Sequence, residues 1–248
     1  MNFRTHALRY AGFDWYVFPI APGGKRPPLI EGGVNSASNN PAIIDHWAQT
    51  WPNANVGLAL GKSGLVAVDL DIKFNPQTGE FAYDWRPTLA AWERDGKRFP
   101  EVPRVRSRGG ERFHLYFRAP KGFSSLSHEL KKFANRGVDV RTGNMYTVLP
   151  PSEAWADKME DGIAGVYRWE VAPLGPALPE PPKWLLDQLR RPPPPKYKAR
   201  AAVPNGLVGY VAALHKVATA EKGTGPKTGR NHELNKQAHL IGRLYEAT

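Results

Sequence analysis

Val66-Ala-Val-Asp69-Leu-Asp71 is an apolar run that ends in two carboxylates. Its β-branched residues favour a buried strand. Side chains two positions apart project from the same face of a strand, so Asp69 and Asp71 would lie about 6.5 Å apart along it. Carboxylate oxygens of this kind suit Mg²⁺ or Mn²⁺. The alternative interpretation is that both acids are solvated where the strand ends.

A third acid lies in a second β-rich run, Val138-Asp139-Val140-Arg141. Arg141 would share a face with Asp139, because the side-chain period of a strand is two. Three carboxylates from two strands can hold two divalent ions, as in-line phosphoryl transfer requires. We therefore expect Asp69, Asp71 and Asp139 to be catalytic metal ligands. The alternative is that Asp139 and Arg141 form a surface ion pair without a catalytic role.

Between these runs, residues 97–121 carry eight Lys or Arg side chains and two acids. The turn Ser107-Arg-Gly-Gly110 would let backbone amides approach an anion closely. Arg112, His114 and Tyr116 alternate onto one face of the strand that follows, where an arginine and an imidazole could hold a triphosphate. A histidine in such a strand can also be a buried structural residue. The residues expected to bind nucleotide are Arg106, Ser107, Arg108, Arg112, His114 and Arg141.

The composition indicates an anionic partner. The 248 residues include 34 Lys or Arg and 23 Asp or Glu, which gives a net charge of +11. Residues 191–248 carry +7 of this charge and residues 1–190 carry +4. The chain has no cysteine, which excludes disulfides, thiol catalysis and thiolate zinc sites. No apolar run approaches the ~20 residues of a membrane span, so we expect a cytoplasmic protein.

Strands interleaved with a few helices predict an α/β or α+β body. We expect helices near residues 3–11, 41–47, 87–95 and 183–189, because each region has helical spacing or end signals. Strands are expected at 15–20, 103–107, 113–117, 137–141 and 145–149. Residues 56–60 and 65–70 are predicted to form a β-hairpin that turns at Lys62-Ser63-Gly64.

A proline spacer divides the chain. The run Arg191-Pro-Pro-Pro-Pro-Lys196 favours a polyproline II conformation. We therefore predict a domain over 1–190, a linker over 191–203 and a basic helical module over 204–248 that is truncated at its C-terminus. The basic residues of this module expected to contact nucleic acid backbone are Lys216, Lys227, Arg230 and Lys236.

In order, the chain reads a D-x-D strand, a basic glycine turn with a histidine strand, and Gly137-Val-Asp-Val-Arg141. Together with Phe18-Pro-Ile-Ala-Pro-Gly-Gly-Lys25-Arg-Pro27, this order resembles the primase–polymerase branch of the archaeo-eukaryotic primase superfamily, found in phage and plasmid replication proteins. The resemblance covers roughly residues 5–152. It implies an α/β primase core with a nucleotide-binding half and a catalytic half.

The resemblance also implies roles for single residues. Asp69 and Asp71 match the metal ligands of the family's first motif, and Asp139 matches the acid of its third. His114 matches the histidine of the second motif, which contacts the phosphates of the incoming nucleotide. Two positions depart from the pattern: Arg112 replaces a usually small residue, and Gly143-Asn144 replaces a frequent Gly-Gly pair.

Residues 229–238 resemble the helical segment that follows this domain in replication proteins of actinobacterial phages, which usually continue into a helicase. The expected function is template-directed synthesis and extension of primers in the bacterial host cytoplasm. Its partners would be single-stranded DNA template, primer and NTP or dNTP. The chain is expected to be either a truncated form of such a protein, with a helicase in the full-length chain, or a stand-alone primase-like module. Its cofactor would be Mg²⁺ or Mn²⁺ at a two-metal site. The alternatives are a non-catalytic single-stranded DNA-binding module and a metal-dependent nuclease.

Overall fold

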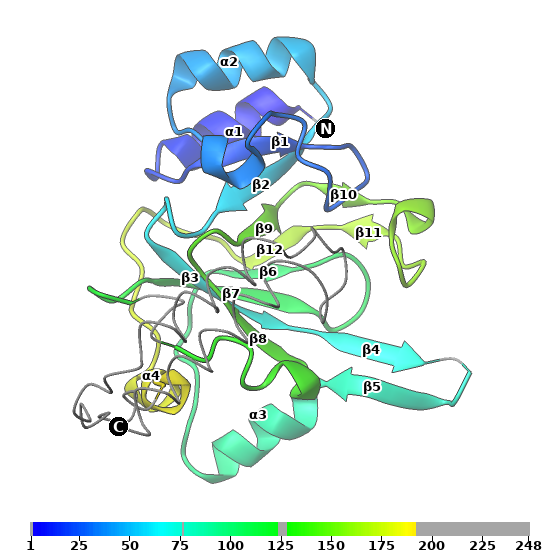
Figure 1. Cartoon of the computed structure of the whole chain (residues 1–248), viewed down its shortest axis with the longest axis vertical. Coiled ribbons are helices and arrows are strands. Elements are labelled where there is room, and N and C mark those ends of the chain that lie inside the picture. Colours follow the sequence, from blue (N-terminus) through cyan, green and yellow to red (C-terminus); the bar gives the residue numbers. More distant parts are fainter. Residues whose placement is uncertain (1, 76, 124–127, 192–248) are drawn as a thin grey trace, which may run out of the picture. The chain divides into compact units, whose positions relative to one another are not determined.

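The computed structural model describes residues 2–75, 77–123 and 128–191 (Figure 1). The α-helices in these ranges are α1 (Phe3–Ala11), α2 (Pro41–Thr50), α3 (Trp85–Arg94) and α4 (Lys183–Leu189). The 3₁₀ helices are η1 (Gly33–Ser36), η2 (Ala134–Arg136) and η3 (Ala156–Lys158). The strands are β1 (Val17–Ile20), β2 (Asn55–Ala59), β3 (Leu65–Leu70), β4 (Ile72–Asn75), β5 (Glu80–Asp84), β6 (Arg104–Arg106), β7 (Phe113–Arg118), β8 (Val138–Arg141), β9 (Tyr146–Leu149), β10 (Glu153–Ala154), β11 (Gly165–Val166) and β12 (Arg168–Val171). The expected mixed α/β class is confirmed for this part of the chain.

The first half of the fold is a three-stranded antiparallel sheet in the order β1-β2-β9, covered by α1 and α2 (Figure 1). Both helices begin at an asparagine whose side chain accepts a backbone hydrogen bond. Asn2 accepts from the Thr5 amide at 3.2 Å, and Asn40 accepts from the Ala42 amide at 2.9 Å. Such caps satisfy amides that lack a partner within the helix.

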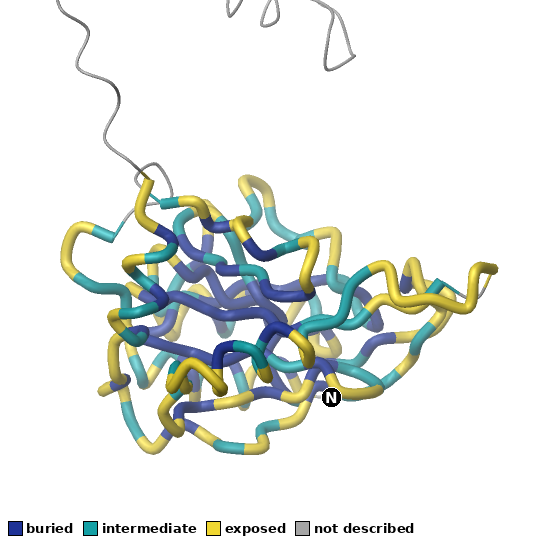
Figure 2. The backbone as a smooth tube through the Cα atoms, turned by 90° about the horizontal axis from the view of Figure 1, so that it is seen from below, coloured by how far each residue is buried: buried dark blue, intermediate teal, exposed yellow. Residues whose placement is uncertain are grey.

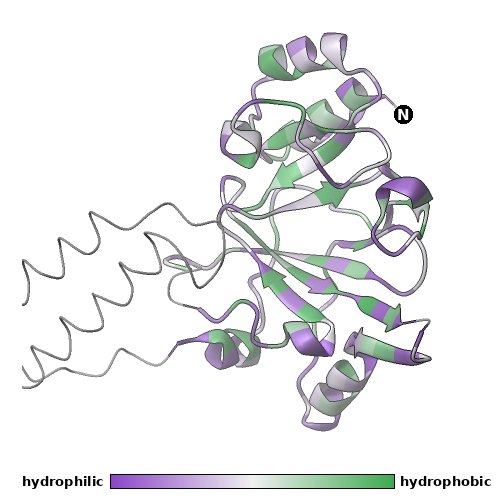
Figure 3. Ribbon diagram, turned by 45° about the vertical axis from the view of Figure 1, so that its right-hand side comes forward, coloured by the Kyte–Doolittle hydropathy of each residue, from purple (hydrophilic) through white to green (hydrophobic). Residues whose placement is uncertain are grey.

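The second half is a five-stranded antiparallel sheet in the order β12-β6-β7-β3-β8. Strand β3 is buried along its whole length, and Figure 2 shows buried residues gathered along the central strands. Its even-numbered side chains, Val66 to Leu70, lie in an apolar cluster with residues of α3 and α4, whereas Leu65 and Ala67 belong to the cluster that includes α1 and α2. In Figure 3 the strands and helices that supply these two clusters carry stretches of hydrophobic residues. Asp69 therefore faces the space between the two sheets.

The predicted β-hairpin of residues 56–60 and 65–70 is wrong, because β2 and β3 belong to different sheets. Strand β2 pairs with β1 and β9, whereas β3 pairs with β7 and β8. Each of the two strands thus has a partner on both of its edges, which leaves no edge at which β2 and β3 could pair with each other. The Leu60 amide donates to the Met145 carbonyl at 3.1 Å, which extends the pairing of β2 with β9 by one residue.

The structure contains a β-hairpin at a place where none was predicted. Strands β4 and β5 pair directly after Asp71, and Phe74 lies opposite Phe81. Asn75 and Gly79 flank the turn, and Phe, Tyr and polar residues alternate beside it, which is a sequence signal for a hairpin. Asp71 therefore lies between β3 and an exposed two-stranded extension of the fold.

The helical module predicted for 204–248 lies outside the described residues, as does the linker after Arg191. Within the described ranges, no helix has the length and apolar character needed to cross a membrane.

Gly137, directly before β8, allows the backbone to pass close to the residues that follow β3. A substitution at this glycine tests the fold. Its φ is +73°, and an added Cβ would lie 2.4 Å from the Asp71 carbonyl oxygen and 2.5 Å from the Trp85 amide nitrogen. We expect Gly137→Ala to lower the free energy of unfolding by roughly 2–4 kcal/mol, because a strained φ and a backbone clash act together. Urea unfolding followed by circular dichroism measures this change.

The matched control is Gly79→Ala, because Gly79 has a φ of +72° but no atom within 4 Å of an added Cβ. It should cost only about 1–2 kcal/mol, the penalty of the left-handed conformation alone. Equal losses in both variants would mean that the close approach at Gly137 contributes nothing.

Candidate functional site

The pairing of β3 brings three of the expected site residues together. Asp69 is the partner of His114 in the register with β7 and of Asp139 in the register with β8. Directly paired residues on adjacent strands have side chains on one face, with Cβ atoms about 4.5–5.5 Å apart. The carboxylate of Asp69 therefore lies between an imidazole and a second carboxylate.

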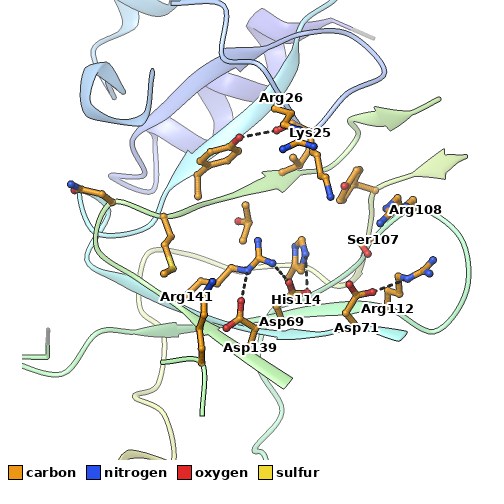
Figure 4. Close-up of a pocket in the computed structure, with 17 residues that line it drawn as sticks. Lys25, Arg26, Asp69, Asp71, Ser107, Arg108, Arg112, His114, Asp139 and Arg141 are labelled. Atoms are coloured by element: carbon orange, nitrogen blue, oxygen red, sulfur yellow. Dashed lines mark hydrogen bonds and ion pairs between the residues drawn. The ribbon is translucent and has the colours of Figure 1, made fainter. Parts of the chain in front are cut away.

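These residues line a pocket of about 470 Å³ between the two sheets (Figure 4). Its volume lies within the ~300–1,000 Å³ typical of small-molecule sites. Strands β3, β7 and β8 supply one wall, and the loop after β1 together with β9 supplies the opposite wall. The lining residues are Lys25, Arg26, Asp69, Asp71, Ser107, Arg108, Arg112, His114, Lys131, Asp139, Arg141, Asn144, Met145, Tyr146, Thr147, Val148 and Tyr167.

Asp69 contacts two neighbours at once. One carboxylate oxygen is 3.5 Å from Nε2 of His114, and the other pairs with Nη2 of Arg141. Burial lowers the pKa of His114, so its imidazole is neutral at pH 7 and donates a single N–H. The Tyr116 hydroxyl lies 3.4 Å from Nδ1 of His114 and 3.0 Å from the hydroxyl of Thr147, and these contacts fix the position of the ring.

Asp139 is the acid with spare bonding capacity. Its Oδ2 lies 3.6 Å from Nε of Arg141, but its buried Oδ1 has no hydrogen-bond partner. Burial raises the pKa of this carboxyl group. The charge of Asp69 raises the pKa of Arg141, so this arginine stays a cation between the two acids. A buried carboxylate oxygen without a hydrogen-bond partner requires an explanation, and a bound cation would supply the missing partner.

Asp71 is held by Arg112. Nε of Arg112 lies 2.8 Å from Asp71 Oδ1, and the same guanidinium donates to the Ile72 carbonyl at 2.7 Å. A second carboxylate, Asp161, lies 3.3 Å from Arg112 Nη2. Arg112 therefore secures the end of β3 and the start of β4, and its charge is shared between two acids.

A comparison with known protein families agrees with this geometry. Residues 7–184 match the Prim-Pol family, described as the N-terminal domain of bifunctional DNA primase/polymerases. The chain belongs to the Prim-Pol family. The match includes every strand of both sheets and all lining residues of the pocket. No curated protein matches the chain significantly. Prim-Pol domains are nucleotidyltransferases of DNA replication, so DNA and nucleotides are the substrates at the level of the family.

Five of the six residues expected to bind nucleotide line the pocket of this Prim-Pol domain. They are Ser107, Arg108, Arg112, His114 and Arg141. Arg106 is outside the lining, because it pairs with Phe113 and so lies on the sheet face opposite to His114. Its guanidinium bonds to Glu170 at 2.6 Å and lies 5.1 Å from the ring centre of Phe113.

The four basic residues proposed to contact nucleic acid in the C-terminal module, Lys216, Lys227, Arg230 and Lys236, lie outside the described residues. Their role stays a prediction.

Sequence reasoning missed one wall of the pocket. Lys25 and Arg26 reach it from the loop after β1, and Tyr167 reaches it from the segment before β12. The signal for the first two was the basic glycine turn Gly23-Gly24-Lys25-Arg26, which is part of the family resemblance but carried no assigned role. Tyr167 had no local signal. Burial raises its pKa to about 12, so its hydroxyl is neutral.

The carboxylates of the pocket fit a divalent ion in their chemistry. Prim-Pol enzymes generally use divalent metals, and hard oxygen donors from Asp69, Asp71 and Asp139 suit Mg²⁺ or Mn²⁺. The unpartnered Oδ1 of Asp139 is available for such an ion. Among the described residues, however, no three His, Asp or Glu side chains converge closely enough to hold one together. Arginine side chains instead balance the acids.

Arg141 therefore stabilises the fold of the site. We expect Arg141→Ala to lower the free energy of unfolding by about 2–4 kcal/mol, because it leaves the buried carboxylate of Asp69 without its cation. Urea unfolding at neutral pH measures the loss. The control is Arg118→Ala, which breaks an exposed 2.8 Å pair with Glu180 and should cost at most about 1 kcal/mol. Equal costs for the two variants would contradict a stabilising role of Arg141.

Proposed function

We propose that this Prim-Pol domain makes and extends primers on single-stranded DNA by template-directed nucleotidyl transfer, in the replication of a phage or plasmid. The observation that carries the proposal is the placement of Asp69 beside both His114 and Asp139 in one pocket. Two acids and a neutral imidazole at this spacing suit the transfer of a nucleotidyl group better than binding alone. A template-binding surface has no use for buried carboxylates, which repel phosphate.

Asp69, Asp71 and Asp139 would hold two divalent ions. When bound, these ions supply a lowered pKa at the primer 3′-hydroxyl and charge compensation for the triphosphate. The chain's own residues position the reactants. Asp139 would contribute its unpaired Oδ1, and Arg112 holds the carboxylate of Asp71, which lines the pocket.

His114 would donate its single N–H to a phosphate oxygen of the incoming nucleotide in place of its 3.5 Å contact with Asp69, whose carboxylate would then face the divalent ions. The Tyr116 hydroxyl at Nδ1 keeps the ring in position, so little conformational freedom is lost when a nucleotide binds. Ser107 and Arg108 line the same pocket and would bind the neighbouring phosphates. Arg141 would turn part of its charge to the triphosphate when cations occupy its carboxylate partners.

The basic module at 204–248, with Lys216, Lys227, Arg230 and Lys236, would bind the template backbone. Binding through phosphate charge weakens steeply as salt increases. In a longer chain this module would lead to a helicase.

Primer extension tests the catalytic assignment. We expect Asp69→Asn, Asp71→Asn and Asp139→Asn each to reduce nucleotide incorporation on a primed single-stranded template with Mg²⁺ or Mn²⁺ by about 10³-fold or more. Asparagine preserves the shape of each side chain but removes its charge. Gel analysis of labelled primers measures both elongation and shortening.

The matched control is Asp45→Asn, because Asp45 pairs with Arg4 on the surface and should leave incorporation unchanged. Normal synthesis by the three site variants would disprove the assignment. Shortening of DNA by the wild-type protein in the absence of nucleotides would favour the nuclease alternative.

His114→Gln tests the phosphate contact. We expect it to weaken nucleotide binding by about tenfold, the value of a lost hydrogen bond to a charged group, and to leave the affinity for single-stranded DNA unchanged. Isothermal titration with nucleotide and fluorescence anisotropy with labelled DNA measure the two affinities. His46→Gln, on the exposed surface of α2, is the control. Equal losses for nucleotide and DNA would contradict the assigned role.

A further inference from the structure

The pocket holds four arginines whose charges are already paired. Arg26 pairs with Glu160, Arg108 with Asp161, Arg112 with Asp71 and Arg141 with Asp69. Lys25 differs from them, because it makes no ion pair with any carboxylate of the described residues, although it lines the same cavity. Figure 4 shows it on the wall opposite to His114 and the acids.

The other lysine of the lining, Lys131, has a different setting. It is exposed, and it follows Leu130, whose carbonyl accepts a 3.1 Å hydrogen bond from the Val140 amide of β8. Lys25 is half-buried and belongs to the half of the fold that carries none of the three expected metal ligands.

The loop that carries Lys25 is fixed by three hydrogen bonds from other parts of the chain. The buried amide of Asn55 donates to the Gly24 carbonyl at 2.8 Å, and the Trp155 amide donates to the Gly23 carbonyl at 2.8 Å. The Tyr146 hydroxyl donates to the carbonyl of Lys25 itself at 3.0 Å. The backbone that positions the lysine is therefore in place before any ligand binds.

Gly23 makes this arrangement possible. Its φ is +70°, and an added Cβ would lie 2.1 Å from the indole of Trp155. Only glycine allows the loop to pass so close to that ring. The backbone is thus shaped and anchored to present one unpaired ammonium group to the cavity.

We propose that Lys25 binds the triphosphate of the incoming nucleotide from the wall opposite to His114. Partial burial of a cation costs hydration free energy. Because Lys25 has no carboxylate partner, an anionic ligand would offset this cost. A lysine binds phosphate as a compact point charge. The triphosphate would thus contact both halves of the domain, with Lys25 on one side and Ser107, Arg108 and His114 on the other. This inference rests on the proposed function.

The test compares nucleotide affinities in the absence of DNA, where no turnover occurs. Titration of the full chain with ATP, dATP and AMP in the presence of Mg²⁺ gives the affinities. Lys25→Gln should bind both triphosphates about tenfold to hundredfold more weakly than the wild type, and AMP within about threefold of it, because one charged contact to the distal phosphates is lost. Lys25→Arg keeps the charge and should restore most of the triphosphate affinity.

Lys183→Gln is the matched control, because it removes the same charge from a side chain of α4 that is 87 % exposed. It should leave every affinity unchanged. Anisotropy with labelled single-stranded DNA separates the two sources of phosphate: Lys25→Gln should bind DNA like the wild type. A loss for DNA that equals the loss for triphosphate would overturn the inference in favour of a template contact.

Other outcomes separate this inference from the proposed function. If the wild type binds triphosphates and extends primers while Lys25→Gln binds ATP normally, the inference fails and the function stands. If the wild type binds no triphosphate, both fail. Circular dichroism of Lys25→Gln confirms that lost affinity is not lost folding.

Discussion

The antiparallel pairing of β3 with both β7 and β8 is the constraint on which the site depends. One register places Asp69 opposite His114 and the other places it opposite Asp139. A slip of one residue on either side would turn one partner to the far face of the sheet, into the apolar cluster of Val66 and Val68. The packing that favours burial of those valines therefore also fixes how Asp69 lies relative to His114 and Asp139. One strand thus contributes both to the core and to the candidate site.

Burial of acids between two sheets requires counter-charges, and the pocket supplies them from its own chain. Arg141 lies between Asp69 and Asp139, and Arg112 lies between Asp71 and Asp161. A single guanidinium that serves two carboxylates limits the cost of taking both out of water. The same arrangement leaves Oδ1 of Asp139 without a hydrogen-bond partner. The arginines therefore offset the negative charge of the acids but do not occupy all of their oxygen atoms.

The local parts of this picture could be predicted from sequence, because they follow from residue patterns. Alternation along β3 predicted that Asp69 and Asp71 share a face, and both line the pocket. Partnerships between distant segments could not be read in this way. The predicted β2–β3 hairpin failed because both strands find their partners far along the chain. The sheet face on which Arg106 lies depends on the register of β6 with β7, which the sequence of β6 alone does not determine. The presence of Lys25 in the pocket depends on how the two sheets are placed against each other.

The internal pairing of the acids separates folding from metal supply. In small zinc domains the energy of metal binding is the energy of folding, so a chelator unfolds them. Here Arg141 and Arg112 offset the carboxylates, and the two sheets pack in two apolar clusters. Under the proposed function, the domain would therefore fold first and bind its divalent ions afterwards. The supply of ions and nucleotides at the moment of replication would then set its activity and not its folding.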